Sequence, residues 1–145
     1  MADAPRFYIF HGENEFSQRE TLAELAQKLG GDPAMIDLNT SRLDGQSLRI
    51  GELVHVCNSI PFLCEKRLVI VSGLLERLSG KDRPADRDAL LDYLPTLPPT
   101  TKLIFLEKKQ LTERNPFVQL AASSGIGYVK SFDSLQGRAL EYWIQ

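Results

Sequence analysis

The chain has 145 residues, of which 43% are hydrophobic and 25% are charged, and it carries a formal net charge of −2. These values predict one soluble globular domain with a sizeable core, and they argue against a nucleic-acid-binding surface built from basic residues. The apolar runs are far shorter than the ~20 residues of a membrane span and the first residues lack the features of a signal peptide, so we expect a cytoplasmic protein without membrane contact.

The chain is expected to begin with a strand and an amphipathic helix. Residues 6–11 are rich in aromatic and β-branched side chains and apolar on both faces, which is typical of a strand covered by helices on both sides. Gly12 ends this run. An apolar stripe at helical spacing follows, made of Leu22, Leu25, Ala26 and Leu29. Gly30 and Gly31 are expected to end the helix.

The next elements are a short strand, a loop, a helix and a third strand. We expect the strand at residues 35–38 and a polar loop at residues 39–45. The helix has Ser47 as its candidate N-cap. Its apolar stripe consists of Ile50, Leu53, Val54 and Cys57. Pro61 is expected to end or bend this helix, and residues 67–71, the most apolar run, are expected to form the third strand.

The remainder of the chain continues the alternation of strands and helices. Residues 76–88 are rich in charged side chains and are expected to be a mobile surface connection. A helix, a strand at residues 102–106, a helix capped by Asn115 and a strand at residues 126–129 follow, and residues 136–145 begin a further helix. This order predicts an α/β fold with three α/β/α layers and a five-stranded parallel sheet.

The turn after the first strand is where a nucleotide-binding α/β domain holds phosphate. A phosphate loop needs the pattern G-x-x-x-x-G-K-[ST], and this turn has only its first glycine, Gly12. Glu13 and Glu15 would repel phosphate, whereas acidic residues suit the dipole of a helix N-terminus. The third strand also ends without an aspartate that could bind magnesium. We therefore expect no nucleotide cofactor and no hydrolysis.

The histidines and cysteines do not form a recognisable metal site or catalytic site. His11, His55, Cys57 and Cys64 lack the spacings typical of zinc ligands. A core Cys57 and a surface His55 are the expected arrangement. Cys64 lies near two cations in the sequence, but no base is identifiable that would activate it. We expect no metal ion and no catalytic residue.

An apolar segment flanked by charges lies between the helix that ends near Pro61 and the third strand. It contains Ile60, Pro61, Phe62 and Leu63. In one interpretation Phe62 and Leu63 fold back into the core. In the other they are an apolar plug that a partner receives in a pocket, as large anchors do at interfaces. The residues alone leave both interpretations open.

Five motifs occur in a fixed order through the chain. They lie at residues 12–16 (Gly-Glu-Asn-Glu-Phe), 60–71, 91–105, 108–111 and 139–144. In sequence and in order they resemble the delta subunit of the bacterial DNA polymerase III clamp loader. The resemblance covers essentially the whole chain, and it depends on the shared order of the motifs more than on any one of them.

The resemblance implies an ATPase-like domain (P-loop NTPase or AAA+-like) without a functional phosphate loop. It also implies that Phe62 and Leu63, flanked by Ile60 and Pro61, bind the β sliding clamp and promote opening of its ring for loading onto DNA. The family often has two aromatic residues at these positions. Leu63 retains the volume of the second one but loses the ring.

Further expectations come from the same resemblance. Residues 1–145 would be a single non-enzymatic N-terminal domain of a subunit of DNA-directed DNA polymerase, a nucleotidyltransferase holoenzyme. Members of the family add a lid domain, towards which residues 136–145 would lead, and a collar domain that assembles with the other clamp-loader subunits, so the chain would be a truncated form. DNA would be reached indirectly.

Two alternative functions remain at this point. The chain could be an inactive ATPase-like stator, a structural subunit of the clamp loader, or a small α/β nucleotide-dependent transferase. Binding of ATP separates the transferase from the other two functions. Binding of the sliding clamp separates the delta-type function from the stator.

Overall fold

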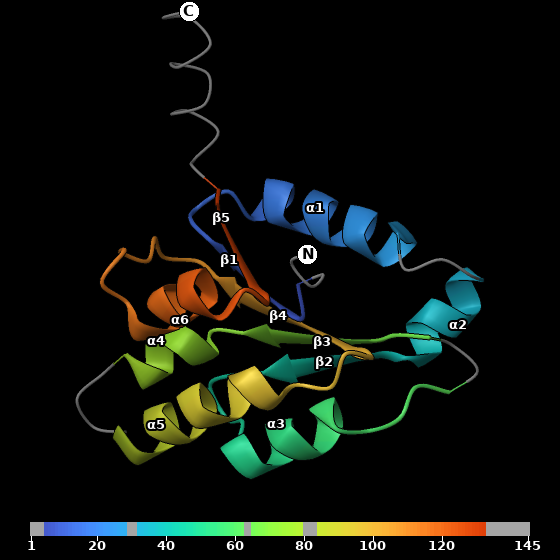
Figure 1. Ribbon diagram of the computed structural model, residues 1–145. Helices are drawn as coiled ribbons and strands as arrows, with labels where there is room; N and C mark the ends of the chain where they lie inside the picture. The colour runs from blue at the N-terminus through green and yellow to red at the C-terminus, as the bar shows by residue number, and fades with distance from the viewer. Residues whose placement is uncertain (1–4, 29–31, 63–64, 80–83, 133–145) are drawn as a thin grey trace, which may run out of the picture.

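The described part of the chain forms a parallel five-stranded sheet with helices on both faces (Figure 1). The computed structural model describes residues 5–28, 32–62, 65–79 and 84–132. In spatial order the strands are β2 (Thr40–Asp44), β3 (Arg67–Ser72), β4 (Thr101–Glu107), β1 (Phe7–His11) and β5 (Gly127–Ser131). The predicted α/β fold with a five-stranded parallel sheet is confirmed.

The helices make up the outer layers. They are α1 (Glu15–Lys28), α2 (Pro33–Leu38), α3 (Ile50–Cys57), α4 (Leu74–Leu78), α5 (Pro84–Tyr93), the 3-10 helix η1 (Leu94–Thr96) and α6 (Pro116–Ser124). In Figure 1, α1 lies above the sheet, whereas α3 to α6 lie below it. No helix in the described ranges is long and apolar enough to cross a membrane.

The central strands are buried on both faces, as their apolar sequences predict. All five residues of β1 are buried. Phe7 and Ile9 belong to the larger core cluster, which includes residues of α3 to α6, whereas Tyr8 and Phe10 belong to the smaller cluster, to which α1 contributes Leu22. Alternate side chains of one strand therefore enter opposite layers, as the pleat of a strand requires.

The second strand and the loop after it are wrong in the sequence-based prediction. Residues 35–38 belong to helix α2, because the side chain of Asp32 accepts a hydrogen bond from the Ala34 N–H (3.0 Å) and Pro33 occupies the start of the helix. The expected polar loop contains strand β2, which pairs with β3. β2 is an edge strand and only half-buried, so it does not need a continuous apolar sequence.

The charged connection at residues 76–88 is shorter than predicted. Helix α4 extends to Leu78, which is fully buried, and α5 begins at Pro84. Apolar residues hold these helices against the core despite the high local charge. The N-cap of α3 is Arg49, which makes no capping side-chain bond, and not Ser47. The predicted helix at residues 136–145, and the helix end at Gly30 and Gly31, lie outside the described residues.

Candidate functional site

The turn between β1 and α1 has a backbone shape that only glycine adopts without strain. Gly12 has φ = 125°, and its N–H donates to the backbone oxygen of Glu107 (3.1 Å). A Cβ atom at this position would lie 2.0 Å from the backbone oxygen of Phe132. The glycine therefore permits a close contact between this turn and the segment after β5.

Polar groups of the protein itself fill this turn. The Gln18 side chain donates to the backbone oxygens of Gly12 (3.0 Å) and Glu107 (3.1 Å). Asn14 caps α1, because its Oδ1 accepts from the Ser17 N–H (3.1 Å). The Asn14 N–H donates to the backbone oxygen of Phe132 (3.3 Å). The N–H groups of Gly12 and Asn14, which lie where a nucleotide-binding loop would face phosphate, thus have partners within the protein.

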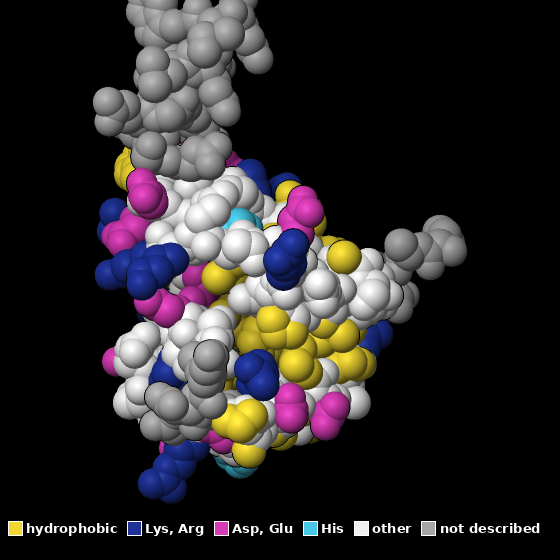
Figure 2. All heavy atoms as spheres, turned by 90° about the vertical axis from the view of Figure 1, so that its left-hand side faces the viewer, with side chains coloured by type: hydrophobic (Ala, Val, Ile, Leu, Met, Phe, Trp, Pro, Cys, Tyr) yellow, Lys and Arg dark blue, Asp and Glu magenta, His cyan; other side chains and the backbone are white. Residues whose placement is uncertain are grey.

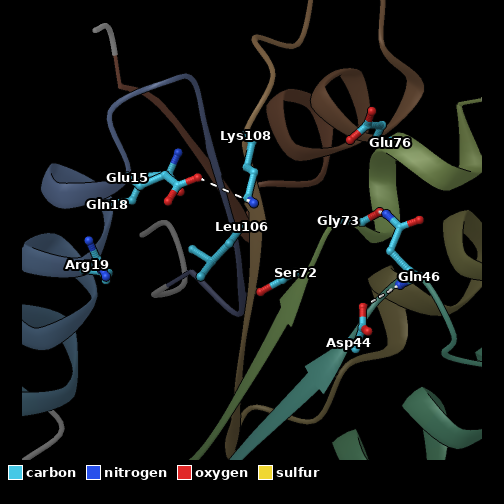
Figure 3. Close-up of a pocket in the computed structure, with 10 residues that line it drawn as sticks. All are labelled: Glu15, Gln18, Arg19, Asp44, Gln46, Ser72, Gly73, Glu76, Leu106 and Lys108. Carbon is cyan, nitrogen blue, oxygen red and sulfur yellow. Dashed lines mark hydrogen bonds and ion pairs between the residues drawn. The ribbon is translucent and has the colours of Figure 1, made fainter. Parts of the chain in front are cut away.

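A pocket of about 420 Å³ lies beside this turn, at the carboxyl ends of the strands (Figure 3). Its lining includes the acidic side chains of Glu15, Asp44 and Glu76 and the basic side chains of Arg19 and Lys108. Lys108 is already paired with Glu15, at an N–O distance of 3.7 Å. A phosphate group in this pocket would meet more carboxylates than cations.

Figure 2 shows the molecule from the side at which the strands end. Acidic and basic side chains are interspersed on this face, with hydrophobic side chains exposed between them. On the visible, described part of this face the basic side chains do not merge into one continuous surface. The face therefore lacks the concentrated positive charge of a surface that binds the DNA backbone.

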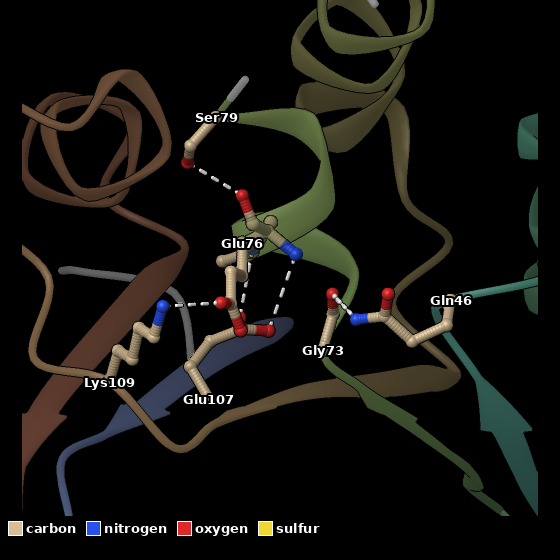
Figure 4. A network of polar contacts seen from close by, with 7 residues as sticks. Gln46, Gly73, Glu76, Ser79, Glu107 and Lys109 are labelled. Carbon is tan, nitrogen blue, oxygen red and sulfur yellow. Dashed lines mark hydrogen bonds and ion pairs between the residues drawn. The ribbon is translucent and has the colours of Figure 1, made fainter.

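Glu107, at the end of β4, is a buried acid that the sequence analysis missed (Figure 4). Its carboxylate accepts hydrogen bonds from the N–H groups of Glu76 (2.9 Å) and Leu75 (3.3 Å), in the first turn of α4. Gly73, the N-cap residue of α4, has no side chain that could do this. Glu107 therefore caps α4 from a neighbouring strand. The signal in the sequence was an acid directly after an apolar strand.

The environment of Glu107 predicts a pH dependence of stability. Burial raises the pKa of Glu107 to about 7, although the hydrogen bonds from α4 oppose this shift. The folded state then binds more protons than the unfolded state, in which glutamate titrates near ~4.3, so the free energy of unfolding falls as the pH rises from about 4.3 to 7. The loss attributable to this group is up to about 4 kcal/mol.

Urea unfolding at several pH values will measure this dependence. Glu107→Gln keeps an acceptor for the α4 N–H groups but cannot ionise, so its stability should fall less than that of the wild type between pH 5 and pH 7. Glu113→Gln makes the same chemical change at an exposed position and should follow the wild type. Identical pH profiles for Glu107→Gln and the wild type would refute the assignment.

The described cysteine and the histidines do not form a reactive centre. Cys57 is fully buried in the core, and burial raises its pKa to about 12, so it is a thiol at neutral pH. The Nδ1 atom of His11 accepts from the Leu111 N–H (3.0 Å), and His55 is exposed on α3. Within the described ranges, His, Cys, Asp and Glu do not form a group of three that could hold a metal ion. Cys64 lies outside those ranges.

The apolar segment predicted from the sequence lies at the opposite end of the sheet, between α3 and β3. We call residues 60–62 the 60–62 segment. The Ile60 residue is 88% exposed and Phe62 is 61% exposed, so neither is part of the core. Leu38, at the end of α2, is also exposed. Leu63 lies outside the described residues, so the structure places only the first member of the predicted Phe62–Leu63 pair.

The exposed ring of Phe62 stands on a backbone that is held firmly. Both the N–H and the carbonyl of Phe62 are hydrogen-bonded to the side chain of the buried Asn39. α3 ends at Cys57, four residues before Pro61, and Lys66 donates to the backbone oxygen of Pro99 (2.8 Å) beyond the segment. The site thus combines a fixed backbone with apolar side chains that face solvent.

Comparison with known proteins agrees with this architecture. The DNA clamp loader delta protein of Bacillus subtilis matches with a TM-score of 0.77 and 21% identity, over 97% of this chain and 42% of that chain. A DNA polymerase III gamma subunit-related protein of Thermotoga maritima matches with a TM-score of 0.55 and 16% identity, over 94% of this chain and 44% of that chain. These identities show a shared fold, and the chain spans less than half the length of either protein.

The sequence comparisons add the family. A search of curated proteins finds no match to this chain. The family model of the DNA polymerase III delta subunit, however, matches residues 8–127. This range includes all of β2, β3 and β4, β1 without its first residue, only the first residue of β5, and the 60–62 segment. The chain therefore belongs to the delta subunit family of DNA polymerase III, the clamp-loader component of the replication machinery.

Proposed function

We propose that this chain binds the sliding clamp through Phe62 and Leu63, flanked by Ile60 and Pro61, and promotes opening of the clamp ring for loading onto DNA. The observation that carries the proposal is the exposure of Phe62, which is 61% accessible although it is a large aromatic residue next to a well-packed core. An aromatic side chain that enters a pocket offers ~150–250 Å² of contact. Exposure favours the partner-binding interpretation over burial in the core.

Ring opening follows from differential binding. A subunit can shift the clamp from its closed to its open form only if it binds the open form more tightly, and only by the difference between the two binding free energies. Phe62 is suited to such contact because hydrogen bonds hold its backbone before binding, so little ordering of this residue accompanies association. The free energy of contact is then available to favour one form of the ring.

The proposed role needs no nucleotide chemistry in this domain. The Gln18 side chain donates a hydrogen bond to the Gly12 carbonyl in the turn after β1. The side chains that line the neighbouring pocket include more carboxylates than cations. Titration of the chain with ATP and Mg²⁺ in a calorimeter should give no saturable heat. A saturable signal would favour the alternative of a nucleotide-dependent transferase.

The whole protein would act as a subunit of the polymerase holoenzyme in the cytoplasm. The chain spans 42% of the Bacillus subtilis clamp loader delta protein, and the remaining part of such a protein would assemble with the other clamp-loader subunits. DNA would be reached through the clamp and not through this domain. The interspersed charges in Figure 2 support that division of roles.

Direct binding of the purified chain to the sliding clamp tests the proposal. Surface plasmon resonance with the immobilised clamp should give saturable binding that soluble clamp abolishes. A folded chain that does not bind the clamp would overturn the proposal and leave the stator as the better description.

A further inference from the structure

Asn39 is a buried polar residue at the junction of α2 and β2, and only 1% of it is exposed. Its backbone N–H donates to the carbonyls of Met35 and Ile36 at the end of α2 (3.1 Å each), and its backbone carbonyl accepts from the Leu68 N–H in β3 (3.0 Å). The main chain of Asn39 is therefore fixed by one helix and one strand. Its side chain makes one further bond to α2 and also reaches a third element.

The side chain of Asn39 bonds to the backbone of Phe62. Oδ1 accepts from the Phe62 N–H (2.6 Å), and Nδ2 donates to the Phe62 carbonyl (2.8 Å) and to the Met35 carbonyl (2.8 Å). One side-chain amide thus pairs with both polar groups of a single residue, as a neighbouring strand would. The two residues are 23 positions apart in the sequence.

This pairing fixes the backbone of Phe62 and leaves its side chain available. Neither hydrogen bond involves the aromatic ring, and the Phe62 residue as a whole is 61% exposed. Both partner groups lie on the Phe62 backbone. The two hydrogen bonds therefore fix the position of the Phe62 Cα atom and the direction of the bond from Cα to Cβ, from which the ring projects. A residue at position 39 must both donate and accept to make this pair, and the shape of an asparagine amide fits both requirements.

We infer that Asn39 is a positioning residue for the clamp contact: it orders the backbone of Phe62 before binding, so that this residue enters the clamp without first being ordered. The inference rests on the proposed function. Without this amide, the backbone of Phe62 would have to be ordered on binding, at a cost that corresponds to roughly a 5- to 30-fold loss of affinity per residue fixed. A residue important only for folding would leave the affinity of the folded chain unchanged.

Three variants test the inference by clamp affinity. Asn39→Ala removes both hydrogen bonds to Phe62, and Asn39→Asp keeps the acceptor but loses the donor. Asn115→Ala is the matched control, because Asn115 also uses its side-chain oxygen to hold a backbone N–H, that of Phe117 (2.9 Å), at the start of α6. Both Asn39 variants should bind the clamp roughly 5- to 30-fold more weakly, whereas Asn115→Ala should bind like the wild type.

A double-mutant cycle and hydrogen exchange separate positioning from a general structural effect. In a Phe62→Ala background, Asn39→Ala should cause much less additional loss of affinity, because it acts through Phe62. In the free wild-type chain, the Phe62 amide should exchange more slowly than an unprotected amide. It should lose this protection in Asn39→Ala and keep it in Asn115→Ala.

The outcomes distinguish this inference from the proposed function. An unprotected Phe62 amide in the wild type would overturn the inference by itself, whether or not the variants fold. Clamp binding by the wild type together with unchanged affinity in folded Asn39 variants would also overturn it and leave the proposed function intact. A wild-type chain that does not bind the clamp would overturn both.

Discussion

Replacement of Phe62 and Leu63 by alanine is expected to weaken binding to the sliding clamp by at least about 2 kcal/mol, roughly a 30-fold increase in Kd. Truncation of an aromatic anchor removes its contact area and leaves its pocket on the partner unfilled. Phe62 is already exposed, so its removal should cost the isolated chain little stability. Surface plasmon resonance will give the affinities, and thermal unfolding will show that the variants are folded.

Phe16 provides a matched control for this experiment. It is a phenylalanine with 60% exposure, close to the 61% of Phe62, but it lies at the start of α1 near the other end of the sheet. Phe16→Ala should bind the clamp like the wild type. Loss of binding in Phe16→Ala with normal binding in the Phe62 and Leu63 variant would move the clamp contact to the opposite end of the domain.

Replacement of Gly12 by alanine is expected to destabilise the fold by about 3 kcal/mol or more. The new Cβ atom would lie 2.0 Å from the backbone oxygen of Phe132 and 2.9 Å from the side-chain oxygen of Gln110, and φ = 125° is unfavourable for any residue with a side chain. The Phe132 N–H donates to the His11 carbonyl (2.7 Å) and β1 pairs with β5, so neither backbone can move without breaking hydrogen bonds. The midpoint of urea unfolding should fall strongly.

Gly51→Ala is the control, and its free energy of unfolding is expected to change in the opposite direction. Gly51 is the second residue of α3, and a Cβ atom there would meet nothing within 4 Å. Alanine at this position should raise the free energy of unfolding by about 0.5–1 kcal/mol, because it favours the helical conformation. If Gly12→Ala were as stable as the wild type, the close approach of the turn to the segment after β5 would be wrong.

The sequence was sufficient for the fold wherever burial is continuous. β1, β3 and β4 are covered on both faces and therefore have unbroken apolar runs. β2 could not be predicted in the same way, because one of its edges and much of its surface face solvent, and its Thr, Ser and Arg residues resemble a loop. The helix α2 did have a signal, an aspartate directly before a proline, but a helix of six residues is too short to show a clear period.

The candidate site could be predicted only in part. The reason differs from that for the fold, because the site depends on contacts between residues far apart in the sequence. The sequence identified Phe62 and Leu63 as an unusual apolar pair, but it could not decide whether they are buried. For Phe62 the answer depends on Asn39, whose side chain reaches it from 23 residues away. Glu107 was missed because its role as a cap depends on the meeting of β4 with α4, which is a property of the tertiary structure.

The separation of the two ends of the sheet has a practical consequence for single-molecule work. β4 has seven residues, so its two ends are roughly 20 Å apart at about 3.3 Å per residue. Lys108 follows the far end and its side chain is 82% exposed, whereas Phe62 lies at the near end. A fluorophore or surface tether attached at Lys108 would therefore leave the 60–62 segment unobstructed, and the arrival of a clamp ring could be followed optically on an immobilised chain.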